Sequence, residues 1–213
     1  MSPKPVLYTY FRSSSAARVR IALHHKGIDY EARPVNLAKG EQLSEAYTSQ
    51  NPAALVPLIV IDGHEICQSV AILEYIEETR PERPLLPKDP ALRAHVRAIV
   101  GAICSDIQPL QNLRVLKTLP EDQREEHART VIAQGLAVVE KMLEATAGAF
   151  CVGDKVTLAD CCLIPQLVNA RRFGVDLCRC PRIQAIEARA NALDAFKKAH
   201  WTQQPDCPAE LSL

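Results

Sequence analysis

The alternation of hydrophobic and polar positions changes character near Pro90. Before this point, short apolar runs of strand length alternate with segments whose apolar residues recur every three or four positions. After it, every apolar segment has the three- and four-residue spacing of a helix. The pattern therefore predicts a mixed α/β domain followed by an all-helical domain.

In the first part, strands are expected at residues 6–10, 30–36, 58–61 and 64–67. Helices are expected at 16–26, ended by Gly27, and at 69–79, with a weaker helix or turn at 42–49. The dipeptide Asp62-Gly63 lies between two short apolar runs and predicts a hairpin turn. The order β-α-β followed by β-β-α is typical of a thioredoxin-like domain.

A proline-rich segment separates the two parts. Three prolines lie between Arg80 and Pro87, and a helix interior does not tolerate this density. We therefore expect a thioredoxin-like domain at 1–83, a linker at 84–90 and a helical domain at 91–213. Within the latter, helices are predicted at 91–116 and 125–145 and from Thr157 and Arg182 onward; Thr157 and Asp160 have the spacing of a capping box.

Composition narrows the class of protein. The chain has 213 residues, with 25 Lys and Arg against 25 Asp and Glu, so no charge excess favours nucleic acid or an anionic membrane as a partner. No apolar run is long enough for a membrane span, and the amino terminus lacks the apolar core of a signal peptide. We expect a cytoplasmic protein, whose eight cysteines are mostly reduced and show no metal-ligand spacing.

The most informative segment is the serine run at the start of the first predicted helix. Ser13, Ser14 and Ser15 follow Arg12 at a point where backbone N–H groups and the helix dipole favour an anion. A serine in this place can also serve only as a helix cap. Three serines flanked by arginines favour an anion site, for which a thiolate or a carboxylate is the natural ligand.

Three further features of the first domain bear on the ligand. Pro57 leaves Val56 extended, so that its backbone can pair with a peptide-like ligand; an ordinary proline at a strand start is the alternative. Gln68 and Ser69 precede a helix, where Ser69 can act as a cap and can receive a carboxylate. A Cys-x-x-Cys pair is absent from the first helix, which excludes dithiol chemistry there.

These features suit glutathione, a tripeptide that brings its own nucleophile. Its backbone would pair with Val56, its γ-glutamyl carboxylate would reach Gln68 and Ser69, and its sulfur would point to Ser13–Ser15. Donors aimed at the sulfur favour the thiolate over the thiol and so lower the pKa of the bound ligand.

Several motifs resemble the zeta-class glutathione transferases, or maleylacetoacetate isomerase family. They are Tyr10-Phe11-Arg12-Ser13-Ser14, the run Arg18–Leu23, Gln68-Ser69, the run Ile107–Asn112, Cys151–Asp154, Thr157–Asp160, Val168–Phe173 and Gln204–Asp206. The resemblance extends over essentially the whole chain. It implies a homodimer with an active site between two domains.

The resemblance also implies the site residues. The glutathione site falls on Ser13, Ser14, Ser15, Ala16, Ala17, Arg18, Gln42, Val56, Pro57, Gln68, Ser69, Gln108, Asn112, Leu113 and Arg114. Ser13 is the expected thiolate stabiliser, with Ser14 beside it and Ser15 completing the catalytic group. Arg12 and Arg172 are expected to bind the acid substrate through guanidinium forks, with Arg114 as a third candidate.

The implied reaction is a glutathione-dependent cis–trans isomerisation of maleylacetoacetate to fumarylacetoacetate in tyrosine and phenylalanine catabolism, by reversible thiolate addition to a small dicarboxylate-like dioxo acid. Two positions depart from the family pattern: Ser15 stands where a cysteine is usual, and Arg114 resembles the related maleylpyruvate isomerases. Maleylpyruvate isomerisation, glutathione transfer or dehalogenation of small electrophilic acids, and non-catalytic glutathione binding therefore remain alternatives.

Overall fold

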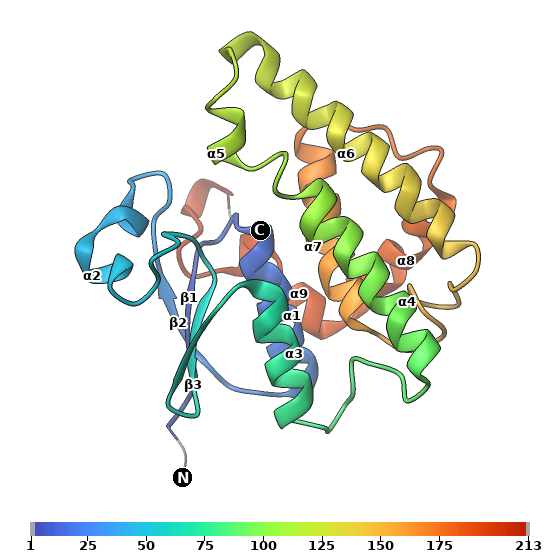
Figure 1. Cartoon of the computed structure of the whole chain (residues 1–213), viewed down its shortest axis with the longest axis horizontal. Coiled ribbons are helices and arrows are strands. Elements are labelled where there is room, and N and C mark those ends of the chain that lie inside the picture. The colour runs from blue at the N-terminus through green and yellow to red at the C-terminus, as the bar shows by residue number, and fades with distance from the viewer. Residues whose placement is uncertain (1–2, 212–213) are drawn as a thin grey trace. The chain divides into compact units, whose positions relative to one another are not determined.

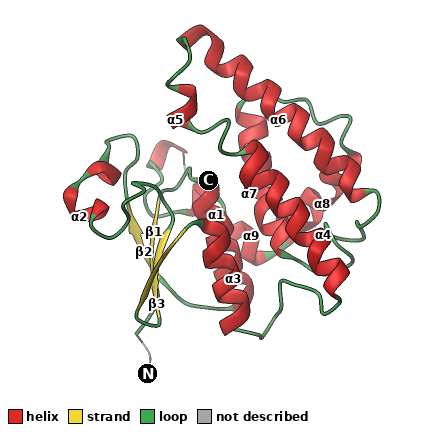
Figure 2. Ribbon diagram, viewed as in Figure 1, coloured by secondary structure: helices red, strands yellow, loops and turns green. Residues whose placement is uncertain are grey.

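The computed structural model describes residues 3–211, which form two compact units (Figure 1). The first contains the described residues up to Pro84 together with those from Leu193 onward, and the second is Leu85–Ala192. Within the described part of the second unit every regular element is a helix, whereas the first unit contains a sheet (Figure 2). No described helix has the length and apolar character needed to cross a membrane.

The first unit is built on a four-stranded sheet in the order β2-β1-β3-β4. Its strands are β1 (Val6–Thr9), β2 (Glu31–Pro34), β3 (Leu58–Ile61) and β4 (His64–Cys67). β1 pairs with β2 in parallel, β3 runs antiparallel to β1, and β4 runs antiparallel to β3. This mixed sheet confirms the thioredoxin-like prediction.

Helices cover both faces of this sheet. Between its strands the chain forms α1 (Ser14–Lys26), a 3₁₀ turn at Glu41–Leu43 and α2 (Glu45–Thr48), and α3 (Ser69–Thr79) follows β4. Because strand side chains alternate between faces, Leu7, Ile59 and Ile61 join α1 and α3 in one core, while Leu58 packs with Tyr47 of α2 in another. Together, the central strands β1 and β3 therefore contribute buried residues on both faces, whereas the edge strands β2 and β4 are more exposed.

The hairpin between β3 and β4 has the predicted turn. Ile61 pairs with His64, and Asp62 and Gly63 between them have φ values of 54° and 82°. Two consecutive residues with positive φ are what a type I′ turn requires, which explains the Asp-Gly sequence.

The chain's C-terminal segment packs on the first unit instead of the helical one. It comprises α9 (Asp194–Ala199) and 3₁₀ turns at Trp201–Gln203 and Ala209–Leu211, and α9 lies against α1. Its carbonyl at Ala199 accepts a hydrogen bond of 3.2 Å from Arg20 Nε. This grouping differs from the sequence-based division, which kept 91–213 together, because tertiary contacts, not sequence periodicity, decide where so short a helix packs.

The second unit contains helices α4 (Pro90–Gly101), α5 (Leu113–Leu116), α6 (Glu121–Leu143), α7 (Leu158–Arg172) and α8 (Pro181–Ala192). The predicted helix at 91–116 is interrupted: a π-helical turn at Ala102–Ile107 follows α4, and an irregular segment precedes α5. Asp160 accepts a hydrogen bond of 2.7 Å from the Thr157 N–H, which is the backbone half of the predicted capping box.

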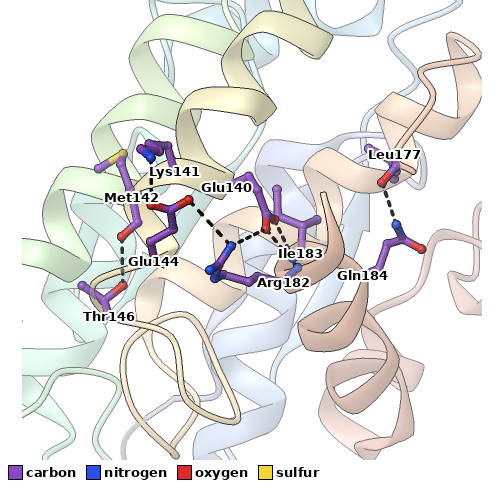
Figure 3. A network of polar contacts seen from close by, with 9 residues as sticks. All are labelled: Glu140, Lys141, Met142, Glu144, Thr146, Leu177, Arg182, Ile183 and Gln184. Atoms are coloured by element: carbon purple, nitrogen blue, oxygen red, sulfur yellow. Dashed lines mark hydrogen bonds and ion pairs between the residues drawn. The ribbon is translucent and has the colours of Figure 1, made fainter. Parts of the chain in front are cut away.

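A polar network fixes the start of α8 against α6 (Figure 3). The Glu140 carboxylate of α6 accepts hydrogen bonds from the backbone N–H groups of Arg182 and Ile183, at 3.1 and 3.0 Å. It also forms an ion pair with the Arg182 guanidinium, with an N–O distance of 3.2 Å. Free N–H groups and the positive end of the dipole at the start of α8 are thus matched by a carboxylate from another helix.

We expect opposite stability effects from two glycine-to-alanine substitutions in the second unit. A Cβ at Gly135 in α6 would overlap the Ile107 side chain, whereas a Cβ at Gly101 meets nothing within 4 Å. Gly101→Ala should therefore stabilise the protein by about 0.5–1 kcal/mol through helix propensity, and Gly135→Ala should destabilise it by about 1–3 kcal/mol through overpacking. Urea unfolding of both variants measures the difference, and equal shifts would contradict this account of the Gly135 contact.

Candidate functional site

The serine run lies at the amino terminus of α1, as the sequence predicts. Ser13 is the N-cap, and its hydroxyl oxygen accepts a hydrogen bond of 3.1 Å from the Ala16 N–H. Ser14 and Ser15 are the first two residues of the helix, and all three serines are half-buried. Because the cap uses only an acceptor site of Ser13, its O–H proton remains available to a ligand.

Arg20 holds the loop that leads to Ser13. Its guanidinium is fully buried and donates to the Thr9 hydroxyl at 2.8 Å and to the carbonyls of Tyr10 and Phe11 at 3.3 and 3.2 Å. Desolvation lowers the pKa of Arg20 to about 10, against the opposing effect of Tyr30 and Asp206, so the side chain is still charged at neutral pH. Arg20 therefore supports the loop.

Arg18 connects the starts of the two long helices of this unit. Its side chain is 2% exposed, and its Nη1 donates a hydrogen bond of 3.0 Å to the Ser69 hydroxyl oxygen. The Nε and Nη2 atoms are buried and have no partner among the described residues. Since Arg18 occupies an acceptor site of Ser69, the Ser69 hydroxyl proton points away from Arg18. The buried positive charge of Arg18 therefore lies next to the Ser69 hydroxyl oxygen.

Ser69 does not cap α3, contrary to the sequence-based expectation. It is the first residue of the helix, and Gln68 occupies the N-cap position without a side-chain capping bond. Gln68 is exposed and has φ 70° and ψ 115°, a backbone conformation that non-glycine residues rarely adopt. Such backbone outliers concentrate at binding sites, and this one lies at the N-cap of α3, directly before Ser69.

The remaining candidates of the first unit differ in accessibility. The Val56-Pro57 peptide bond is cis, and the Val56 N–H donates no hydrogen bond to any described residue, which leaves it free for a ligand backbone. Gln42 is half-buried, and its Oε1 is buried without a described partner. Ala16 is fully buried, and its N–H is already used by Ser13, whereas Ala17 is half-buried.

The candidates of the helical unit lie near the π-helical turn and at the end of α7. Gln108 is half-buried; Asn112 accepts a hydrogen bond of 3.0 Å from the Arg114 N–H and so caps α5. Leu113 and Arg114 are exposed. Arg172 is also exposed and lies 5.4 Å from the Phe173 ring centre.

The sequence analysis did not single out a buried amide pair in the helical unit. Gln111 Nε2 donates a hydrogen bond of 3.1 Å to Gln166 Oε1, and the other amide atom of each residue is buried without a described partner. Nothing in the sequence distinguishes these glutamines from surface ones, since the signal is their burial. No group of three potential metal ligands occurs among the described residues.

Comparison with protein-family models identifies the class of protein. Residues 4–78 match the N-terminal domain of glutathione S-transferases, and residues 121–199 match their C-terminal domain. The fold and the two matched segments therefore define a glutathione S-transferase.

Individual relatives narrow the class. Maleylacetoacetate isomerase of Mus musculus is 53% identical over 210 residues, which are 98% of this chain and 97% of that protein. The structure of maleylacetoacetate isomerase from Methylobacterium extorquens AM1 with bound malonate and glutathione has a TM-score of 0.92 at 39% identity, over 96% of this chain and 100% of that one. The holo structure of a bacterial zeta-class maleylpyruvate isomerase has a TM-score of 0.92 at 39% identity, over 95% of this chain and 100% of that one. The chain belongs to the zeta-class maleylacetoacetate isomerase family of glutathione transferases.

We expect Ser69→Ala to destabilise the protein by about 1–3 kcal/mol, because it removes the described acceptor of the buried Arg18 guanidinium. Ser49→Ala is the matched control, since Ser49 is exposed and its hydroxyl contacts only the nearby Ala46 carbonyl; its effect should stay within about 0.5 kcal/mol. Chemical denaturation compares the two. A Ser69 variant as stable as the control would mean that Arg18 does not depend on this hydroxyl.

Proposed function

We propose that this protein is a glutathione-dependent cis–trans isomerase that converts maleylacetoacetate to fumarylacetoacetate. The observation that carries the proposal is the Ser13 hydroxyl: its oxygen is engaged by the Ala16 N–H, and its proton is free at the positive end of α1. This arrangement favours an anion and donates a hydrogen bond to it. Family membership and the bound ligands named for the relatives support glutathione and a dicarboxylate as the two ligands.

The first unit contains unsatisfied polar groups that fit glutathione. Ser69, polarised by Arg18, and the start of α3 suit a carboxylate; the free Val56 N–H suits a peptide carbonyl; and the orphaned Gln42 Oε1 suits an N–H donor. Each of these groups lacks a described partner for the atom that would meet the ligand. Bound glutathione supplies a thiolate that adds reversibly to the alkene, which permits rotation about the former double bond.

Ser13 lowers the pKa of the bound thiol because its hydroxyl donates a stronger hydrogen bond to the thiolate than to the thiol. Ser14 and Ser15 add N–H groups at the helix start. Ser15 replaces the family's usual cysteine with another small polar side chain. Since Ser13, not residue 15, is the N-cap, the exchange leaves the geometry of the thiolate donor intact.

Arginines are assigned to the acid substrate. Arg12 and Arg172 are exposed, and neither forms an ion pair with a described residue, so both can offer a guanidinium fork to a carboxylate. Positive charge in these positions also stabilises the enolate-like charge that develops during addition. Arg114, exposed in α5, is the third candidate.

The second candidate function is isomerisation of maleylpyruvate, or glutathione transfer to small electrophilic acids. The similarity to the maleylpyruvate isomerase structure and the exposed Arg114 favour it specifically. A homodimer and a cytoplasmic location, both expected from the sequence, belong to the proposal as predictions.

A spectrophotometric time course tests the function. Maleylacetone or maleylacetoacetate is supplied with catalytic glutathione, maleylpyruvate is run in parallel, and free thiol is titrated throughout. We expect isomerisation with the thiol undiminished and the maleyl diketone acid as the faster substrate. Faster turnover of maleylpyruvate would favour the second candidate, and consumption of thiol would identify a transferase.

Replacement of Ser13 should separate thiolate activation from ligand binding. Ser13→Ala removes the hydroxyl, and we expect the pKa of bound glutathione to rise and turnover at neutral pH to fall about tenfold or more, with little change in glutathione affinity. Ser13→Thr keeps both the cap and the donor and should retain activity. Ultraviolet titration of the bound thiolate measures the pKa. Unchanged turnover in the alanine variant would contradict the assignment.

Two adjacent arginines of α7 provide a matched pair for the acid site. Arg171 is engaged by Glu187, with Nε 3.2 Å from Oε1, whereas Arg172 has no described carboxylate partner. Arg172→Ala should raise KM for the acid about tenfold without affecting KM for glutathione, because a charge-assisted pair is lost. Arg171→Ala should change stability only. A rise confined to KM for glutathione would place Arg172 in the other half of the site.

A further inference from the structure

The C-terminal segment lies on the loop that carries Arg12 and Ser13. The ring of Trp201, the chain's single tryptophan, lies 6.3 Å from the Phe11 ring, measured between centroids. The Arg12 guanidinium carbon lies 5.8 Å from the Trp201 ring centre and 5.4 Å from that of Phe11. Arg12 is thus placed over two aromatic rings, within the range of a cation–π interaction.

Asp206 fixes the backbone of the same loop. Its Oδ2 accepts a hydrogen bond of 2.8 Å from the Phe11 N–H, a contact between residues 195 positions apart in the sequence. The Phe11 carbonyl accepts from Arg20 at 3.2 Å. Both backbone polar groups of Phe11 are therefore held, one by α1 and the other by the C-terminal segment.

These contacts matter because no other described residue restrains the Arg12 side chain. Its side chain is exposed and forms no hydrogen bond or ion pair with a described residue. A free arginine side chain has many rotamers, and ordering it when a substrate binds reduces affinity. Stacking on Trp201 restricts the guanidinium before the substrate arrives and leaves its hydrogen-bond donors open.

We propose that Trp201 and Asp206 are positioning residues for the acid substrate: Trp201 orients the Arg12 guanidinium, and Asp206 holds the Phe11 backbone from which Arg12 projects. The inference rests on the proposed function for the role of Arg12. It adds that the C-terminal segment, although outside the thioredoxin-like sequence, is part of the acid-recognition machinery.

Intrinsic fluorescence tests the inference without catalysis. Because Trp201 is the only tryptophan, its emission reports directly on the environment of Arg12. We expect malonate, added to the glutathione-saturated protein, to change the emission saturably, at the concentrations at which calorimetry detects binding. The Arg12→Gln variant should lose the response. Malonate binding without an emission change, or no malonate binding, would overturn the inference.

Kinetics distinguish positioning from simple stabilisation. Trp201→Leu should raise KM for the acid about two- to fivefold and leave KM for glutathione unchanged, while Trp201→Phe, which keeps an aromatic face, should stay near wild type. Asp206→Ala should lower kcat/KM for the acid, and Asp206→Asn, whose amide oxygen can still accept from Phe11, should restore most of it. Asp194→Asn, an exposed carboxylate of α9, is the control.

The two possible failures are separable. A wild-type protein that does not isomerise maleyl acids contradicts the proposed function, and the malonate titration then decides the inference alone. If the wild type is active but Trp201→Leu leaves KM for the acid unchanged, or raises both KM values together, Trp201 and Asp206 have only a structural role and the inference is wrong.

Discussion

A buried guanidinium that forms no ion pair with a described carboxylate determines how the first unit is assembled. Arg20 has lost its hydration shell, and desolvation lowers its pKa to about 10, yet it remains charged at neutral pH. Burying such a group costs free energy unless its donors are satisfied. Its acceptors come from the end of β1, from the loop at Tyr10 and Phe11, and from Ala199 of α9. Satisfying one cation therefore brings together the sheet, the serine loop and a segment from the far end of the chain.

The elements that the sequence predicts best are those whose signals are local. β3, β4 and α3 have the predicted bounds, because an Asp-Gly turn fixes the hairpin and an uninterrupted apolar spacing marks the helix. Gly27, with φ 70°, ends α1 as predicted, since the left-handed conformation there favours glycine. The π-helical turn at Ala102–Ile107 and the short α9 could not be predicted in this way. The π-helical turn has the same apolar spacing as the helix before it and packs against α6, and the six residues of α9 are too few to show a helical period.

The candidate site was predictable in its residue types but not in their division of labour. By residue type and spacing alone, Arg12, Arg18 and Arg20 are similar cations next to a serine run; only the family resemblance assigned Arg12 to the acid and Arg18 to glutathione. The structure gives them three different tasks: Arg12 faces solvent over aromatic rings, Arg18 lies beneath Ser69, and Arg20 binds backbone carbonyls. Burial separates these roles, and burial of alternate charged positions on one helix cannot be read from spacing alone.

A buried arginine without a described carboxylate partner gives a physical reason for an anionic ligand in the first unit. The chain has equal numbers of acidic and basic residues, and several cations away from the site have carboxylate partners: Lys26 with Glu77 at 2.7 Å, and Arg182 with Glu140 at 3.2 Å. Arg12 and Arg18 have none among the described residues, although both adjoin helix starts that are themselves positive. Arg12 is exposed and stays hydrated, whereas Arg18 is buried with two donor atoms that have no described partner, which costs free energy in the unliganded protein. In the proposed function, a carboxylate bound beside Ser69 would offset part of that cost.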